Sequence, residues 1–252
     1  MKKVILKTVL LLAAGLVGLT PAAHGERPIW AIKATGFPVR CMERSEFHKC
    51  KPLRIPSPDH KSSVEVAYGK DKDIMFAFLR LVSPGRGTRE FAAPCSYGDD
   101  ELLWSPNSKA FFINGGCGSS ISGFLVSIYL VDSVNIDAGL DLTHKAMRDM
   151  VKSFPPCKAL HHDPEECKVM QTDPEYYNMS GIDWLEDSSG IVVMSEVPPS
   201  SRYGGIMGQV MGYELEVPSG NILRRLNAVQ LKMKWQKSMA WKLYIPDPPE
   251  YQ

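Results

Sequence analysis

The sequence is short of the motifs that carry enzyme chemistry. It has no H-E-x-x-H zinc motif, no G-x-S-x-G nucleophile turn and no phosphate loop ending in G-K-S or G-K-T. The glycine-rich stretch Gly204–Gly208 lacks that ending, and we expect a strand after it where a phosphate loop requires a helix. We therefore predict that the protein is not an enzyme, with no catalytic residues and no cofactor.

Patterns for binding a metal are also missing. No two cysteines are spaced as C-x-x-C, which argues against a structural zinc site. The densest set of potential ligands is His161, His162 and Asp163, in a polar stretch without the spacing of a metal motif. We keep these three residues as candidate ligands but expect a solvated loop and no bound metal.

Long hydrophobic runs are missing except near the N-terminus. Val9–Leu19 is apolar, follows three lysines and precedes small residues that frame a cut before Glu26. This layout is typical of a secretory signal peptide, and the run is too short for a comfortable membrane span. We expect residues 1–25 to be removed on export and the protein to be periplasmic or secreted. No later segment is apolar enough to be a transmembrane segment.

Neither sign of charge dominates the chain. Removal of Lys2, Lys3 and Lys7 with the signal lowers the formal net charge from +1 to −2. That balance gives no electrostatic attraction to nucleic acid. Residues 26–252 suffice for one large domain, and we predict a single β-rich repeat domain there.

All six cysteines follow the predicted signal. An even number of cysteines suits an oxidising compartment, in which disulfides form. Fifteen complete pairings of six cysteines exist. Sequential pairing fits the local geometry best, and each short loop that it closes would be worth about 2–4 kcal/mol. This scheme predicts three disulfides, Cys41–Cys50, Cys95–Cys117 and Cys157–Cys167.

The chain is organised around the stretch Glu101–Asp132. An apolar strand ends at Trp104, a Ser-Pro-Asn-Ser turn follows, and the apolar run Ala110–Ile113 is typical of a strand covered on both faces. A third strand, Phe124–Val131, completes the unit. We expect a flexible tip between the last two strands, formed by Gly115, Gly116 and Gly118.

A second copy of this pattern begins near Ile182. The spacing is 80 residues for Trp104 and Trp184, and 84 residues for Tyr129 and Tyr213 and for Leu142 and Leu226. A common unit of about 80 residues accounts for these spacings. We expect the two tryptophans to pack in the core rather than to form ligand platforms, since they stand at equivalent positions.

Other segments follow simpler patterns. Further strands are predicted at Ile29–Gly36, Val64–Tyr68, Asp73–Val82, Gln209–Val217 and Met239–Ile245. Asp141–Phe154 has apolar residues at helical spacing, and Asp141 can cap its start. Leu226–Lys237 has two interpretations, because its apolar residues alternate as in a strand whereas its residue types and the repeat spacing favour a helix. We take the helix as the prediction.

The motif at Trp104 resembles the TolB-like, WD40-like β-propeller repeat. Trp104-Ser105-Pro106 matches the first three residues of that family's Trp-Ser-Pro-Asp-Gly turn, and Asn107 and Ser108 stand for the last two. The closing strand matches at Ile128, Tyr129 and Asp132, the second copy keeps Trp184 and Asp187, and a third copy keeps only Ser57-Pro58-Asp59. The resemblance implies a mainly β fold of propeller-like β-meander blades with one or two short helical insertions. A β-sandwich is the alternative.

The resemblance implies a binding scaffold and no particular chemistry. We predict an exported, non-catalytic binding protein whose partner is a protein or another envelope component. Candidate contact residues are Arg202, Tyr203, Trp241 and Tyr244, in a loop and in the C-terminal segment. The alternatives are a periplasmic hydrolase with a site assembled from distant residues and an immunity- or inhibitor-type protein.

Overall fold

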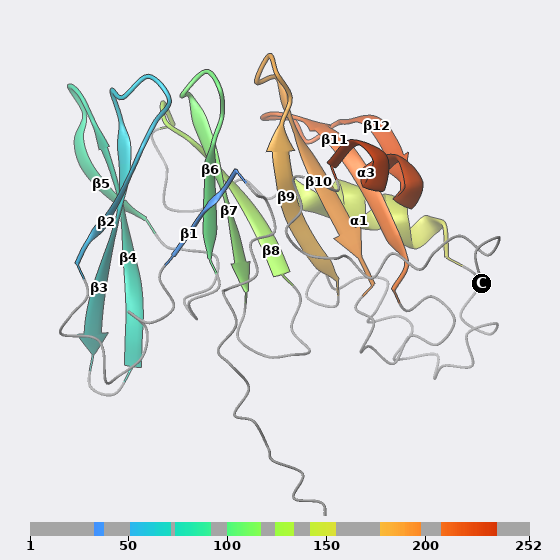
Figure 1. The fold of residues 1–252 in the computed structure, drawn as a ribbon, viewed down its shortest axis with the longest axis horizontal. Helices are drawn as coiled ribbons and strands as arrows, with labels where there is room; N and C mark the ends of the chain where they lie inside the picture. The colour runs from blue at the N-terminus through green and yellow to red at the C-terminus, as the bar shows by residue number, and fades with distance from the viewer. Residues whose placement is uncertain are drawn as a thin grey trace, which may run out of the picture.

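Residues 33–37, 51–71, 74–91, 100–116, 124–133, 142–154, 177–197 and 208–235 are described by the computed structural model. They form twelve strands in three four-stranded antiparallel sheets, together with two helices (Figure 1). The sheets stand side by side, and we call them the first, middle and last sheet from left to right in Figure 1. No helix within these ranges is both long and apolar enough to cross a membrane.

The first sheet has the strand order β2-β3-β4-β5. Its strands are β2 (Leu53–Pro56), β3 (Ser63–Asp71), β4 (Ile74–Ser83) and β5 (Gly87–Phe91). The strand predicted at Val64–Tyr68 is confirmed within β3, where Val64 and Val66 are buried and Glu65 lies on the opposite face.

The middle sheet has the order β1-β6-β7-β8. Its strands are β1 (Thr35–Gly36), β6 (Glu101–Trp104), β7 (Ala110–Gly116) and β8 (Phe124–Leu130). Of the predicted strand Ile29–Gly36, residues 33–36 are described, and within them Thr35 and Gly36 form β1. The expected tip is wrong at Gly115 and Gly116, which pair with Leu125 and Phe124 inside the β7–β8 ladder.

The last sheet has the order β12-β11-β10-β9 and lies between two helices. Its elements are β9 (Asn178–Trp184), β10 (Gly190–Glu196), β11 (Val210–Glu216) and β12 (Ile222–Asn227), with α1 (Thr143–Lys152) and α3 (Ala228–Trp235). The helices cover opposite faces, because α1 packs with Tyr213 and Leu215 whereas α3 packs with Leu226 (Figure 1). Helix α1 confirms the predicted helix, but its N-cap position is Leu142 rather than Asp141 and has no side-chain cap.

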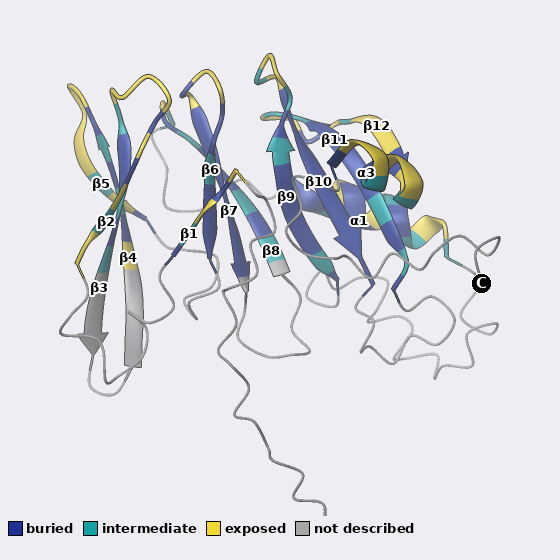
Figure 2. Cartoon of the chain, viewed as in Figure 1, coloured by how far each residue is buried: buried dark blue, intermediate teal, exposed yellow. Residues whose placement is uncertain are grey.

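Strand β7 divides the hydrophobic core between its two faces. Phe111 and Ile113 belong to a core shared with the first sheet, and Phe112 belongs to a core shared with the last sheet and α1. All three side chains are fully buried, so the interpretation of Ala110–Ile113 as a strand covered on both faces is confirmed (Figure 2).

Equivalent hydrogen bonds join successive sheets. The indole Nε1 of Trp104 donates to Ile55 O at 3.2 Å, and Nε1 of Trp184 donates to Leu103 O at 3.1 Å. The partners are 49 and 81 residues apart, respectively. Both rings are buried, which confirms a core role for the tryptophans.

The turns at the top of the three sheets in Figure 1 share a conformation. Their fourth residues, His60, Ser108 and Ser188, have φ of 58°, 63° and 61°. The backbone N–H of Asp59 donates to Ser108 Oγ at 3.0 Å, and that of Asn107 donates to Ser188 Oγ at 3.1 Å. The turns of the first and middle sheets are thus each bonded to the turn of the next sheet.

The tyrosine and leucine spacings do not reflect equivalent positions. Tyr129 pairs with Phe111, whereas Tyr213 pairs with Val193. Relative to the tryptophans, Tyr213 is therefore two residues out of register. The leucine spacing is also wrong as a guide to structure, because Leu142 precedes α1 whereas Leu226 lies in strand β12.

Cations donate to the turn that follows β8 in the middle sheet and to the turn that follows β11 in the last sheet. From β5, Arg89 Nη1 donates to Ser133 O at 2.6 Å. From α1, Lys145 Nζ donates to Ser219 O at 2.9 Å. Helix α1 thus plays, between the middle and last sheets, the part that β5 plays between the first and middle sheets.

Candidate functional site

Helix α3 begins with a reciprocal pair of hydrogen bonds. The backbone N–H of Gln230 donates to Asn227 Oδ1, and the backbone N–H of Asn227 donates to Gln230 Oε1, both at 2.9 Å. This is a capping box, which satisfies two backbone donors at the start of a helix. The helix predicted in Leu226–Lys237 is confirmed over Ala228–Trp235, and the strand interpretation is wrong.

One face of α3 is anchored in the last sheet. Leu231 is fully buried and Trp235 is nearly so, one helical turn apart. Gly212 makes room for the anchor, because a Cβ added there would lie 2.5 Å from Leu231 Cδ2. The anchored side chains join a cluster with Ile182, Val192, Met194, Val210 and Leu226.

The opposite face of α3 is apolar and exposed. Val229 is 48% exposed and Met233 is 83% exposed, and they lie four positions apart, so they share one face of the helix. Leu223 in β12 is 52% exposed. Within the described ranges only Phe78 joins them as a large exposed hydrophobic residue, so three of these four residues lie in β12 and α3. We name Val229, Lys232, Met233 and Lys234 the α3 surface; Lys232 is half-buried and the other three are exposed. Figure 2 shows much of α3 in the colour of exposed residues.

The segment that carries the α3 surface is cationic. Strand β12 and helix α3 contain Arg224, Arg225, Lys232 and Lys234 and no acidic residue. Arg224 is paired with Glu214 of β11. Lys234 Nζ lies 3.9 Å from a carboxylate oxygen of the same Glu214 and 4.3 Å from the centre of the Trp235 ring. The carboxylate of Glu214 therefore forms ion pairs with both Arg224 and Lys234.

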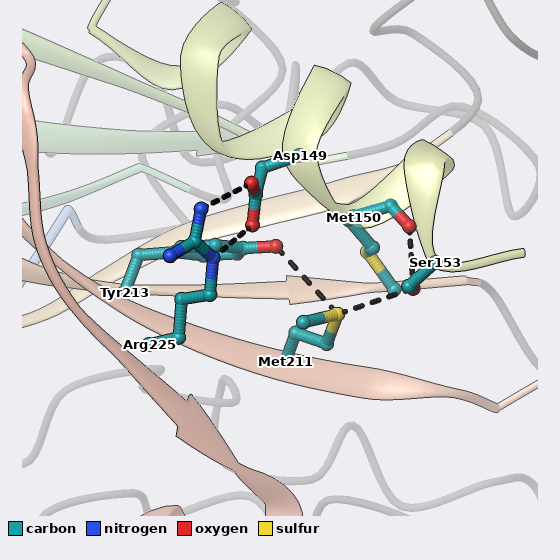
Figure 3. A network of polar contacts seen from close by, with 6 residues as sticks. All are labelled: Asp149, Met150, Ser153, Met211, Tyr213 and Arg225. Carbon is teal, nitrogen blue, oxygen red and sulfur yellow. Dashed lines mark hydrogen bonds and ion pairs between the residues drawn. The ribbon is translucent and has the colours of Figure 1, made fainter.

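An ion pair fixes β12 to α1. Arg225 donates from Nε and Nη2 to the two carboxylate oxygens of Asp149, at 2.7 and 2.6 Å (Figure 3). These hydrogen bonds lower the pKa of Asp149, and they raise the pKa of Arg225. A two-pronged arginine–carboxylate contact is geometrically restrictive, so it orients β12, which leads directly into α3.

Hydroxyl–sulfur contacts complete the junction of α1 with the last sheet. Ser153 Oγ and Tyr213 Oη each donate to Met211 Sδ at 3.6 Å (Figure 3). Burial raises the pKa of Tyr213, which keeps its hydroxyl protonated. The protonated tyrosine therefore serves as a hydrogen-bond donor at this junction.

The buried side-chain amide of Asn114 links the middle and last sheets by hydrogen bonds. Asn114 Oδ1 accepts from Gly181 N at 2.7 Å, and Asn114 Nδ2 donates to Gly181 O at 2.9 Å and to Glu101 Oε2 at 3.1 Å. The amide thus satisfies the backbone of β9 across the sheet boundary. In the described part of the chain, no three histidine, cysteine or acidic residues gather closely enough to hold a metal.

The residues singled out from sequence lie outside the described ranges. This holds for the contact candidates Arg202, Tyr203, Trp241 and Tyr244, and for the metal candidates His161, His162 and Asp163. It also holds for all six cysteines, Cys41, Cys50, Cys95, Cys117, Cys157 and Cys167. These assignments remain predictions.

The α3 surface had a signal in the sequence. Asn227 and Gln230 have the spacing of a capping box, which places the helix start. From that start, the alternating apolar residues fall into a buried pair and an exposed pair. When apolar residues alternate along a helix, some of them lie on the face that does not pack on the core. In α3 these are Val229 and Met233.

No protein-family model matches the chain, and searches of curated proteins and of solved structures found no match either.

Proposed function

We propose that the chain is an exported, non-catalytic binding protein that contacts another protein through the α3 surface. The observation that carries this proposal is the exposure of Met233 and Val229 on the face opposite the buried Leu231 and Trp235. The core contact of α3 is already made by the buried pair. The second apolar pair belongs to none of the core clusters of the described residues. Apolar side chains one turn apart are the kind of anchor that a helix inserts into a partner's groove.

The mounting of α3 favours binding. The capping box of Asn227, the Gly212–Leu231 contact and the Arg225–Asp149 ion pair hold the helix and the strand before it in one place. A surface that is ordered before binding loses less conformational entropy when it docks. The flexible thioether of Met233 adapts to irregular partner surfaces.

We further propose that the three sheets are blades of an open, propeller-like stack. The equivalent Trp104 and Trp184 bonds and the linked turns support this reading over a sandwich of two sheets. The outer face of the first sheet carries the cross-strand ion pairs Arg54–Glu65 and Arg80–Glu90, which suit solvent. At the other end, α3 packs on the far face of the last sheet, where a further blade would pack.

Export is part of the proposal and is supported by the charged start, apolar run and small-residue cut of residues 1–25. The hydrolase alternative has no comparable support. Among the described residues, Asp149 and Glu214 are held in ion pairs and Glu101 is bonded to Asn114.

A comparison of variants tests the proposal. The exported full chain is immobilised and exposed to envelope extract, beside a Val229→Ser/Met233→Ser variant and a Val229→Ile/Met233→Leu control that keeps the surface apolar. We expect a partner that the wild type and the control retain and the serine variant loses. Identical proteins on all three chains would refute binding through α3, provided that circular dichroism shows all three folded.

A further inference from the structure

We infer that residues 236–252, which follow α3 directly, fold back over Val229 and Met233 and compete with the partner for the α3 surface. This inference rests on the proposed function and names a regulation of the same site. It follows from the apolar character of the surface, from the residue pattern of the segment and from the attachment of the segment to the end of the helix.

The α3 surface offers apolar contact and no charge that would select an occupant. The arginines of β12 and both lysines of α3 are already engaged with partners. Val229 and Met233 belong to none of the core clusters of the described residues and are 48% and 83% exposed. The surface therefore fits an apolar occupant whose own charges are balanced.

Residues 236–252 lie outside the described ranges, and their sequence has this character. Met239, Trp241, Leu243 and Ile245 alternate with other residues, which would give an extended chain one apolar face. The segment has two lysines and two acidic residues, so its side-chain charges cancel. It can thus cover an apolar surface without bringing an unpaired charge to it.

The spacing of the apolar residues fits the helix. Val229 and Met233 are about 6 Å apart along the helix axis, from 1.5 Å per residue. Alternate side chains of an extended chain are about 6.6 Å apart, from 3.3 Å per residue. The polar residues 236–238 suffice for a reversal of the chain. Met239 then comes level with Met233, and Trp241 with Val229.

Attachment to α3 favours this occupant over one from solution. The segment begins after Trp235, two residues beyond Met233, so its docking is intramolecular. A short flexible linker gives an effective concentration on the order of millimolar. The indole of Trp241 would bury a large apolar area, and the thioether of Met233 makes favourable contacts with aromatic rings. A partner from solution therefore has to displace the segment.

Competition of this kind has a measurable consequence. It lowers the apparent affinity for the partner in proportion to the fraction of chains whose surface is open. The sequence alone predicted instead that Trp241 contacts the partner directly. Removal of the apolar side chains of the segment should strengthen partner binding if they cover the surface, and weaken it if they contact the partner.

Photo-crosslinking of the purified full chain tests the contact. Benzoylphenylalanine replaces Met233, and mass spectrometry of the digest locates the adduct. We expect an adduct within one chain, on residues 239–245, that Met239→Ser/Trp241→Ser removes and Met239→Leu/Trp241→Phe keeps. A chain folded by circular dichroism that gives no adduct on residues 236–252, or an adduct between two copies, would overturn the inference.

A synthetic peptide of residues 236–252 tests the competition. It should bind the full-length Met239→Ser/Trp241→Ser variant about tenfold or more tightly than it binds the wild type, whose own segment occupies the surface. Binding should be lost when Val229→Ser/Met233→Ser is added to that variant. Equal affinities for the first two chains, or no binding to either, would overturn the inference.

Envelope extract separates the inference from the proposed function. The Met239→Ser/Trp241→Ser variant should retain more of the partner than the wild type does. A partner that needs Val229 and Met233 but is retained equally or less by this variant would overturn the inference and leave binding through α3 intact. Identical proteins on the wild type and on Val229→Ser/Met233→Ser would refute the proposed function and the competition with it, and the crosslink would still decide the contact.

Discussion

The backbone N–H of Asn107 donates to the hydroxyl of Ser188 at 3.1 Å, across the boundary between the middle and last sheets. The same bond joins Asp59 to Ser108 one sheet earlier. Each serine therefore links its own turn to the turn before it. The order of the stack depends on contacts between residues far apart in sequence.

Removing either serine hydroxyl should loosen one sheet boundary. We expect Ser108→Ala and Ser188→Ala each to lower the free energy of unfolding by about 0.5–1.5 kcal/mol, measured by urea denaturation. Ser189→Ala is the matched control, because its hydroxyl bonds Asp187 within its own exposed turn. An equal loss in the control would mean that the bonds between turns contribute nothing specific.

A side chain at Gly212 should displace α3. In Gly212→Ala, the new Cβ would lie 2.5 Å from Leu231 Cδ2, and overpacking of this kind costs about 1–3 kcal/mol. Leu231→Ala alone should cost about 2–5 kcal/mol, since the side chain is fully buried. The double variant should lose less than the sum, because the truncated leucine accommodates the alanine. Additive losses in a thermal-unfolding cycle would contradict the Gly212–Leu231 contact.

The Asp149–Arg225 pair should make stability depend on pH. Hydrogen bonds from Arg225 lower the folded-state pKa of Asp149, so the pair stabilises the fold above the ordinary carboxyl pKa of about 4. That contribution is lost as the pH falls through the depressed folded-state pKa. We expect Asp149→Asn to lower Tm at pH 7 and to match the wild type at the acid end of the scan. Glu90→Gln, in an exposed pair with Arg80, should change Tm less at pH 7. A constant Tm difference at every pH would contradict this account.

Processing and cystine pairing give a prediction that comes from the sequence alone. The exported protein should begin at Glu26, and peptide mapping without reductant should recover Cys41–Cys50, Cys95–Cys117 and Cys157–Cys167. Mass spectrometry of the purified chain reads both. A Cys41–Cys157 bridge would contradict the sequential scheme.

The regular inner strands and the first helix could be predicted because their apolar residues stand at the positions that are buried. Ala110–Ile113 is apolar throughout because both of its faces are covered, and α1 shows helical spacing because one face of it packs against a sheet. Trp104 and Trp184 stand at equivalent positions because each donates to the preceding sheet.

Short edge strands could not be predicted in this way. Strand β5 is Gly-Thr-Arg-Glu-Phe and β12 is Ile-Leu-Arg-Arg-Leu-Asn, and most of their side chains are exposed or half-buried, so neither has the alternation of a half-buried strand. Strand β2 ends in Pro56, where the middle and last sheets have tryptophan, so its turn at Ser57 lacked the strongest mark of the motif.

The exposed face of α3 was hard to recognise in the sequence, because the residues proposed to bind the partner gave the segment a strand-like pattern. Val229 and Met233 made the segment alternate like a strand because they are apolar without being buried. The capping box at Asn227 and Gln230 adds to the helix-favouring residue types and marks where the helix begins.

Photo-crosslinking in the cell tests binding through α3 most directly. Benzoylphenylalanine replaces Met233 in one strain and Glu90, on the outer face of the first sheet, in another. We predict that the probe at 233 yields one discrete protein adduct and that the probe at 90 does not. The same adducts at both positions, or none at 233 in an exported and folded protein, would contradict the account.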